Sequence, residues 1–240
     1  MCVIFLAFDS HPDHSLILIA NRDEYFERPT AAAGYWEDFP NIYGGRDLIG
    51  GGTWLGVTTS GRFAAVTNYR DRSAPIATRS RGDLVADYLK TEEPPEAYLK
   101  RIKVHSGEYS GFNLLVGTIG VQRELYYYSN RGAGPKPLSP GIYGLSNHLL
   151  DTPWPKVVKG KTAFTGLLEN EDLTNAGLFG ILADETLAAD EELPSTGIPY
   201  ESEKALSAVF IKTDGYGTRC SSVLKFERDR NWSFEERVFV

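Results

Sequence analysis

Apolar runs at the start of the chain predict a β-hairpin. Residues 2–8 (CVIFLAF) are almost continuously apolar and rich in Val, Ile and Phe, which is typical of a strand buried on both faces. The turn-forming segment DSHPDH follows, and then a second apolar run, SLILIAN. Residues 2–21 are therefore predicted to form two antiparallel strands joined by a short turn.

The rest of the chain mixes strand-like and helix-like patterns. We expect residues 25–52 and 184–203 to be irregular, because they are rich in glycine, proline or acidic residues. Apolar residues three and four positions apart predict helices in GDLVADYLK, PEAYLKRIK, PWPKVVKGKTAFTGLLEN and LTNAGLFGILAD. β-rich runs predict strands in TWLGVTT, RFAAVTN, FNLLVGTI, ELYYYSN, GIYGLSN, ALSAVFIK, TRCSSVLKFE and SFEERVFV.

This order of elements indicates an α+β protein. Strands lie at both ends of the sequence and helix pairs lie between them, with no internal repeat and no clear linker. We expect the last strands to pair with the first ones, which would make residues 1–240 a single domain. Antiparallel sheets covered by layers of helices are the architecture that this pattern favours.

Composition narrows the classes of partner and compartment. The formal net charge of −7 argues against nucleic acid as a partner, because an acidic surface repels phosphate groups. The first residues lack the cationic segment of a secretory signal, and no apolar run approaches the ~20 residues of a transmembrane helix. Two cysteines, Cys2 and Cys220, make no disulfide framework, so we expect a reduced, cytoplasmic protein.

Cys2 is the first candidate for chemistry. If Met1 is removed, this residue carries a thiol nucleophile and an α-amino base, whose pKa of about 7.7–8.0 suits proton transfer at neutral pH. The alternative is that Cys2 is an inert, buried strand residue, which is common for free cysteines.

Four polar residues, Asn21 to Glu24 (NRDE), end the second predicted strand. In a hairpin they lie opposite Cys2, where a carboxylate could hold an α-ammonium group and a guanidinium could favour a thiolate. Alternating side chains point to opposite faces of a strand, so only one of Arg22 and Asp23, or Asn21 with Asp23, would face the site. A solvated polar turn is the other interpretation.

Other polar residues occupy similar positions at strand ends. Asn68 and Asn147 end predicted strands, and Arg219 begins one. Asparagine side chains can donate to a developing oxyanion, although turn capping and solvation explain each residue singly. Trp54 follows a glycine-rich segment and is expected in the core or in a pocket wall. We expect no metal site and no cofactor, and Asp9, His11, Asp13 and His14 fall on a predicted hairpin tip.

Seven motifs in order resemble the NRDE family, also called the transport and Golgi organisation two family. They are MCVIFLAF, ANRDEYFERPT, GGTWLGVT, AAVTNYR, GFNLL, YGLSNHLLDTPWPKV and GYGTR, and the resemblance covers essentially the whole chain. It implies an N-terminal nucleophile hydrolase fold, a four-layer αββα sandwich of two antiparallel sheets between helices.

Choloylglycine hydrolases and penicillin V acylases are the nearest comparison within that superfamily. The resemblance implies that Cys2 is the nucleophile, that Asp23 orients its amine, and that Asn68 and Asn147 help to bind the oxyanion and the amine. Arg219 matches a late arginine of such sites. The sequence departs from these acylases at Ala20, where they have an arginine.

The resulting hypothesis is a cysteine amidohydrolase that cleaves a non-peptide C–N bond of a small acylated substrate. Its catalytic residues would be Cys2, Asp23, Asn68, Asn147 and Arg219, and Asn21, Arg22, Glu24 and Trp54 would bind substrate. The rival hypothesis is a non-catalytic carrier of a hydrophobic ligand, haem or an acyl lipid. An interaction scaffold on an inherited fold is a third possibility.

Overall fold

The chain divides into two compact units whose segments alternate along the sequence. The computed structural model describes residues 2–71, 77–120, 123–170, 173–229 and 231–240. The first unit takes the described residues of Met1–Glu27, Arg70–Arg72 and Pro140–Val240, and the second those of Arg28–Tyr69 and Ser73–Ser139. The prediction of a single domain over residues 1–240 stays a prediction.

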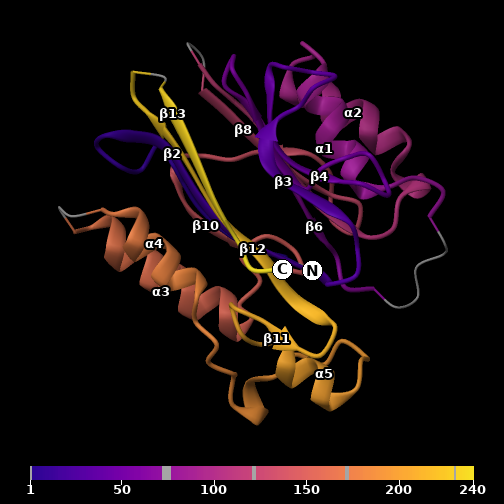
Figure 1. Cartoon of the computed structure of the whole chain (residues 1–240), viewed down its shortest axis with the longest axis vertical. Coiled ribbons are helices and arrows are strands. Elements are labelled where there is room, and N and C mark those ends of the chain that lie inside the picture. The colour runs from indigo at the N-terminus through magenta and orange to yellow at the C-terminus, as the bar shows by residue number, and fades with distance from the viewer. Residues whose placement is uncertain (1, 72–76, 121–122, 171–172, 230) are drawn as a thin grey trace. The chain divides into compact units, whose positions relative to one another are not determined.

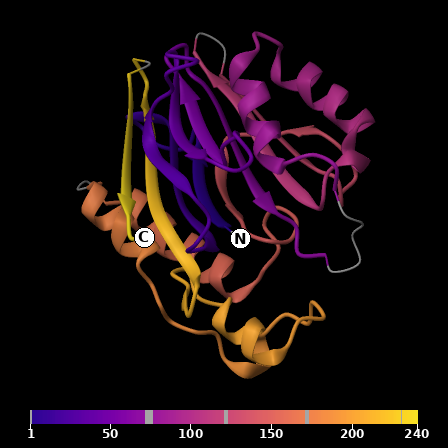
Figure 2. The same cartoon turned by 45° about the vertical axis from the view of Figure 1, so that its right-hand side comes forward.

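An antiparallel sheet forms the centre of the first unit. Its order is β10-β1-β2-β12-β11, and β13 also pairs with β12. Figures 1 and 2 show the yellow C-terminal strands running beside the indigo N-terminal ones, which confirms that the last strands pair with the first. The bounds are β1 Cys2–Phe8, β2 His14–Tyr25, β10 Gly141–Leu145, β11 Lys212–Thr213, β12 Tyr216–Glu227 and β13 Trp232–Val238.

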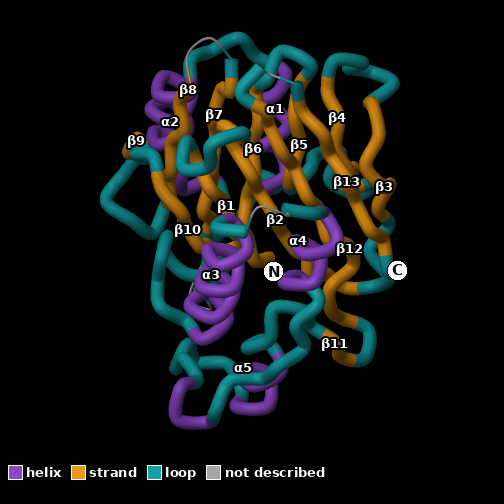
Figure 3. Tube along the Cα trace, turned by 90° about the vertical axis from the view of Figure 1, so that its left-hand side faces the viewer, coloured by secondary structure: helices purple, strands orange, loops and turns teal. Residues whose placement is uncertain are grey.

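Helices cover one face of this sheet. Odd-numbered residues of β1 and β2, with Phe5 and Ile19 among them, pack in one buried cluster against Phe164 of α3 (Pro155–Leu168) and Leu178 of α4 (Asn175–Leu182). Figure 3 shows both helices lying against the strands of this sheet. A short helix, α5 (Tyr200–Ala205), and a 3-10 helix, Asp190–Glu192, lie in the segment before β11.

The second unit contains a second antiparallel sheet with its own helices. The strands follow the order β3-β4-β5-β6-β7-β8-β9. Their bounds are β3 Thr30–Tyr35, β4 Ile42–Asp47, β5 Leu55–Thr58, β6 Arg62–Asn68, β7 Phe112–Ile119, β8 Arg123–Ser129 and β9 Lys136–Pro137. The helices are α1 Arg81–Lys90, α2 Pro95–Val104 and the 3-10 helix Ser106–Glu108.

Aromatic residues join the helices of the second unit to its sheet. Tyr88 and Tyr98 are fully buried in one cluster with Phe112 and Leu114 of β7. The Tyr88 hydroxyl donates to the Gly117 carbonyl at 3.1 Å, so the phenol is satisfied in an apolar core.

The α+β prediction with two antiparallel sheets is confirmed, and two local predictions are wrong. Residues 25–52 contain β3 and β4. Their alanine and glycine residues form strands because β4 pairs with β5 and β3 pairs with β4 at the edge of the sheet. ALSAVFIK is not a strand: α5 ends at Ala205, and only Lys212–Thr213 forms a short pairing. No helix in the described part of the chain is long and apolar enough to cross a bilayer.

Close packing of α3 on β1 gives a test of this architecture. A Cβ atom built on Gly160 would lie 2.1 Å from Cζ of the fully buried Phe5. Gly160→Ala should therefore lower the free energy of unfolding by about 1–3 kcal/mol. Gly166 of the same helix is exposed with nothing within 4 Å, so Gly166→Ala should raise it by about 0.5–1 kcal/mol. Denaturant unfolding of both variants measures this, and equal effects would contradict the packing.

Candidate functional site in the first unit

A row of three side chains crosses the first sheet where β1 begins. Arg22 of β2 pairs with Cys2 of β1 on one side and with Cys220 of β12 on the other. All three residues are buried, and both cysteines are free. Because β2 separates them, the Cα atoms of the cysteines are about 9–10 Å apart, too far for a disulfide.

The NRDE segment is therefore part of a strand, since β2 continues to Tyr25. The prediction that it lies opposite Cys2 is confirmed by the register, and the alternative of a solvated turn is wrong. Asn21, Arg22 and Asp23 are all buried.

Burial sets the resting state of the Cys2 thiol. It raises the pKa of the thiol, and the nearby Asp23 carboxylate adds to the rise. The Arg22 guanidinium and the Asp23 backbone N–H, which donates to the sulfur, favour the thiolate and act in the opposite direction. The net pKa is above its ordinary value, so the resting sulfur is a neutral thiol that needs a base at the moment of attack.

Asp23 is held on the helix-covered side of the sheet. Its carboxylate accepts a hydrogen bond from the Thr218 hydroxyl at 2.7 Å, and Thr218 Oγ1 in turn accepts from the Ile211 N–H at 2.9 Å. The Tyr216 hydroxyl donates to the Asp23 carbonyl at 3.3 Å. Burial raises the pKa of the Asp23 carboxyl, while Lys156 and the Thr218 hydrogen bond limit the rise.

Asn147 lies beside the main chain of Cys2. The Ser146 hydroxyl is 3.2 Å from the Cys2 carbonyl oxygen and 3.2 Å from Asn147 Oδ1. The Asn147 carbonyl accepts from the Arg70 N–H at 2.7 Å. Both Ser146 and Asn147 are buried, directly after β10, which pairs with β1. The first unit thus brings Cys2, Asp23 and Asn147 together.

Lys156 is a member of this cluster that the sequence prediction missed. It is the second residue of α3 and is only 3% exposed. No described residue forms a hydrogen bond with its Nζ atom. Burial lowers the pKa of Lys156 from 10.5 to about 8, partly offset by Asp23 and Cys2. A cation in the first turn of a helix opposes the helix dipole, and this was the available sequence signal.

A buried ion pair borders the same cluster. Arg70 Nη1 lies 2.5 Å from Glu203 Oε2, with side chains 7% and 6% exposed. The Thr196 N–H donates to the other carboxylate oxygen of Glu203 at 2.9 Å, and the Arg70 guanidinium lies 4.8 Å from the centre of the Trp154 ring. The pair fastens α5 to the segment that follows β6.

Three other predicted site residues are engaged in structural contacts. Asn21 Nδ2 donates to the carbonyls of Leu182 and Val209 at 2.8 and 2.9 Å, which anchors α4 to β2. Glu24 accepts from the neighbouring Tyr25 N–H at 2.9 Å. Arg219 is the extra residue of a bulge in β12, and its guanidinium donates to the Tyr25 carbonyl at 2.9 Å. These contacts hold the ends of β2 and β12.

The remaining two predicted residues belong to the second unit. Asn68 is the last residue of β6 and pairs with Phe112 of β7. Trp54 is half-buried and packs against the aromatic core of that unit, which agrees with the expectation of a core or wall residue. Among the described residues, no three His, Cys, Asp or Glu side chains are grouped to hold a metal ion.

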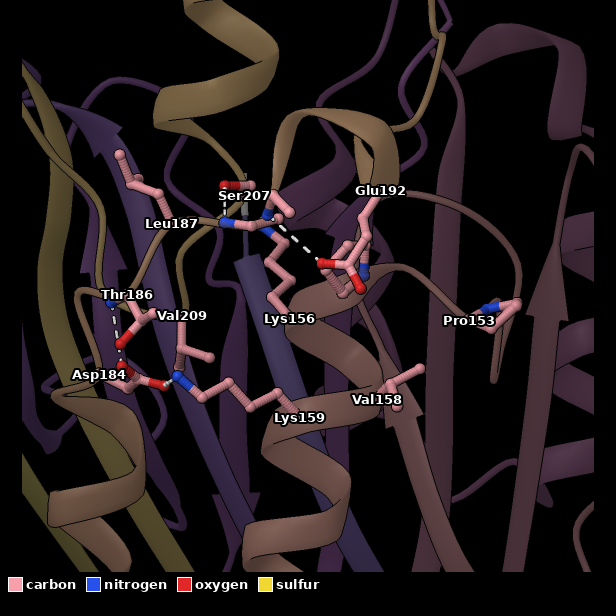
Figure 4. Close-up of a pocket in the computed structure, with 13 residues that line it drawn as sticks. Pro153, Lys156, Val158, Lys159, Asp184, Thr186, Leu187, Glu192, Ser207 and Val209 are labelled. Atoms are coloured by element: carbon pink, nitrogen blue, oxygen red, sulfur yellow. Dashed lines mark hydrogen bonds and ion pairs between the residues drawn. The ribbon is translucent and has the colours of Figure 1, made fainter.

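A cavity of about 600 Å³ opens beside Lys156. Figure 4 shows Lys156 projecting from α3 into it, near Ser207 and Leu187. Its wall comes from the start of α3, from residues 184–189 and from the segment before β11. Lys156 is therefore shared between the cavity and the surroundings of Cys2 and Asp23.

The chain is similar to known proteins over most of their length. The family model "Transport and Golgi organisation 2" matches residues 1–240. "Transport and Golgi organization protein 2 homolog" from Bos taurus is 37% identical, with 100% of this chain and 94% of the relative covered. The Drosophila melanogaster "Transport and Golgi organization protein 2" is 30% identical, with 100% and 93% covered.

A solved structure shares the fold. The Caenorhabditis elegans ortholog of N-acylethanolamine-hydrolyzing acid amidase aligns over 100% of both chains with a TM-score of 0.53 and 9% identity. At this identity the similarity establishes the fold and not the activity. The fold is that of N-terminal nucleophile hydrolases, as the family resemblance implied.

Burial of Lys156 should make the stability of the protein depend on pH. Its pKa is about 8 in the folded chain and about 10.4 unfolded. Between these values the unfolded chain binds more protons, so stability rises with pH. The wild type should gain about 2.5 kcal/mol relative to Lys156→Met between pH 8 and 10.5. Denaturant unfolding across this range measures the gap, and a gap independent of pH would contradict the assignment.

Proposed function

This chain belongs to the transport and Golgi organisation 2 family, and we propose that it is a cysteine amidohydrolase of the N-terminal nucleophile type. The observation that carries the proposal is the arrangement of Cys2, Asp23 and Thr218: a buried thiol at a strand start, an N–H at its sulfur and a positioned carboxylate. The fold shared with an amidase supports it. A free thiol suits the reduced, cytoplasmic location that we also propose.

The first half of the reaction needs a base, because the resting thiol is neutral. We assign this role to the α-amine of Cys2 after removal of Met1, which lies outside the described residues. The amine takes the thiol proton, and the sulfur electron pair forms a bond to the amide carbonyl carbon while the C=O π pair moves to oxygen. Asp23 orients the resulting ammonium, and Asn147 donates to the oxyanion.

The second half returns the enzyme to its starting state. The C–N bond breaks, and the leaving nitrogen takes the proton from the Cys2 ammonium group. Water then attacks the thioester, which releases the carboxylic acid and restores the thiol. Arg22, paired with Cys2 in the sheet, favours the thiolate during attack. We assign no step to Asn68 in the second unit, or to Asn21, Glu24 and Arg219, which hold strand ends.

Substrate hydrolysis tests the proposal with a matched control. N-Dodecanoylethanolamine is the first probe, because the structural neighbour is named for hydrolysis of N-acylethanolamines. Cys2→Ala should lower kcat/KM by at least ~10³-fold. Cys220→Ala removes a thiol of equal burial from the same row and should change it less than about threefold.

Release of dodecanoic acid, followed by mass spectrometry, gives the rate. If a panel of acyl amides shows no turnover, and Cys2→Ala binds them as well as the wild type does, the protein is a carrier of hydrophobic ligands and the hydrolase proposal is wrong.

A further inference from the structure

The cavity beside α3 has the size of a small-molecule site. Its volume of about 600 Å³ lies within the range of about 300–1,000 Å³ typical of ligand pockets. The wall combines apolar side chains of Val158, Leu187 and Val209 with charged groups. It lies within the first unit, and none of its lining residues has a role in the proposed mechanism.

Most polar groups of the cavity wall already have partners. Lys159 forms an ion pair with Asp184 at 2.7 Å. Glu192 accepts from the Ala189 N–H at 3.3 Å. The Ser207 hydroxyl donates to the Lys204 carbonyl at 2.6 Å and accepts from the Ala188 N–H at 2.9 Å. Figure 4 shows the Lys159–Asp184 pair, the Ala189–Glu192 bond and the Ala188–Ser207 bond as dashed lines.

Lys156 differs from these groups. The residue is only 3% exposed. Among the described residues, no acceptor forms a hydrogen bond with its Nζ atom. An ammonium group has three N–H donors, and burying them without acceptors is costly. A ligand with a negatively charged oxygen would satisfy them, and the wall must shift to admit that oxygen because Nζ itself has almost no accessible surface.

Charges around Lys156 favour a ligand with a single negative charge. The carboxylates of Asp23 on β2 and Glu203 on α5 act on its charge, as do Arg70 and the Cys2 thiol. Asp23 is bound by Thr218, and Glu203 is bound by Arg70. Further acidic residues of the wall, Asp184 and Glu192, would repel a dianion such as phosphate about twice as strongly as a monoanion.

We propose that this cavity binds a small molecule through one carboxylate group, which accepts hydrogen bonds from Lys156 Nζ while an acyl chain lies against Val158, Leu187 and Val209. The proposal goes beyond the assigned reaction and does not require Cys2 to be catalytic. The proposed hydrolysis does not require an acid group on the ligand. The carboxylate site and the hydrolase activity can therefore be tested separately.

Calorimetry on Cys2→Ala protein, which cannot form the thioester, tests the site. N-Dodecanoylglycine and N-dodecanoylethanolamine carry the same acyl chain, with and without a carboxylate. The glycine compound should bind at least tenfold more tightly. Adding Lys156→Met should abolish this preference. Adding Lys159→Met, which removes the other lysine of the wall, should leave it within threefold, and Lys156→Arg should preserve it by keeping the charge.

Equal affinity for the two amides, or equal losses from Lys156→Met and Lys159→Met, would overturn the proposal. Dodecanoate distinguishes the source of the carboxylate: binding as tight as that of N-dodecanoylglycine indicates a site for free acids, and weaker binding indicates a site for acid-bearing amides. If the preference for the carboxylate holds while wild-type protein hydrolyses neither amide, the carboxylate site stands and the hydrolase proposal fails.

Discussion

The pairing of β2 between β1 and β12 is the constraint on which the candidate site depends. Successive residues of a strand point to opposite faces, so a slip of one residue would exchange the two sets of side chains. In the observed register, Arg22 stands between the two thiols, while Asp23 pairs with Thr218 on the helix-covered face. The bulge at Arg219 lets β12 keep both pairings. Thiol, guanidinium and carboxylate therefore surround the start of β1.

Packing of α3 and α4 on the sheet buries the charged groups that this register brings together. Asn21 binds the carbonyls of Leu182 and Val209, and Gly160 lets α3 approach Phe5 closely. This approach carries Lys156 into the same buried region as Asp23. Burial raises the pKa of Cys2 and of Asp23 and lowers the pKa of Lys156, and each shift favours the neutral form of the group. Such a cluster lowers stability and is typical of functional sites.

Periodicity predicted the parts of the fold whose sequence signal is local. The hairpin of residues 2–21 and the four helices were found because their apolar residues repeat at the periods of strands and helices. β3 and β4 were missed because alanine and glycine have weak strand preference, and pairing with a neighbouring strand overrides it. ALSAVFIK was assigned wrongly because short apolar runs fit a strand and a buried loop equally well.

Prediction of the site had a similar limit. Hairpin pairing and the family resemblance together predicted Cys2, Asp23 and Asn147, which lie at or near the ends of their strands. Arg70 and Glu203 are 133 residues apart, and neither lies in a motif that indicates its partner. Lys156 resembled any helix lysine, since only packing of α3 shows that its ammonium group is buried.

The central claim is that Cys2 becomes an N-terminal nucleophile that carries the acyl group of an amide. Mass spectrometry of N-terminal peptides, after acid quenching of the protein with N-dodecanoylethanolamine, tests it most directly. The account predicts a peptide that begins at Cys2 and carries a dodecanoyl thioester, sensitive to hydroxylamine. An N-terminal peptide that retains Met1, with no acyl group on Cys2 at any time, would contradict it.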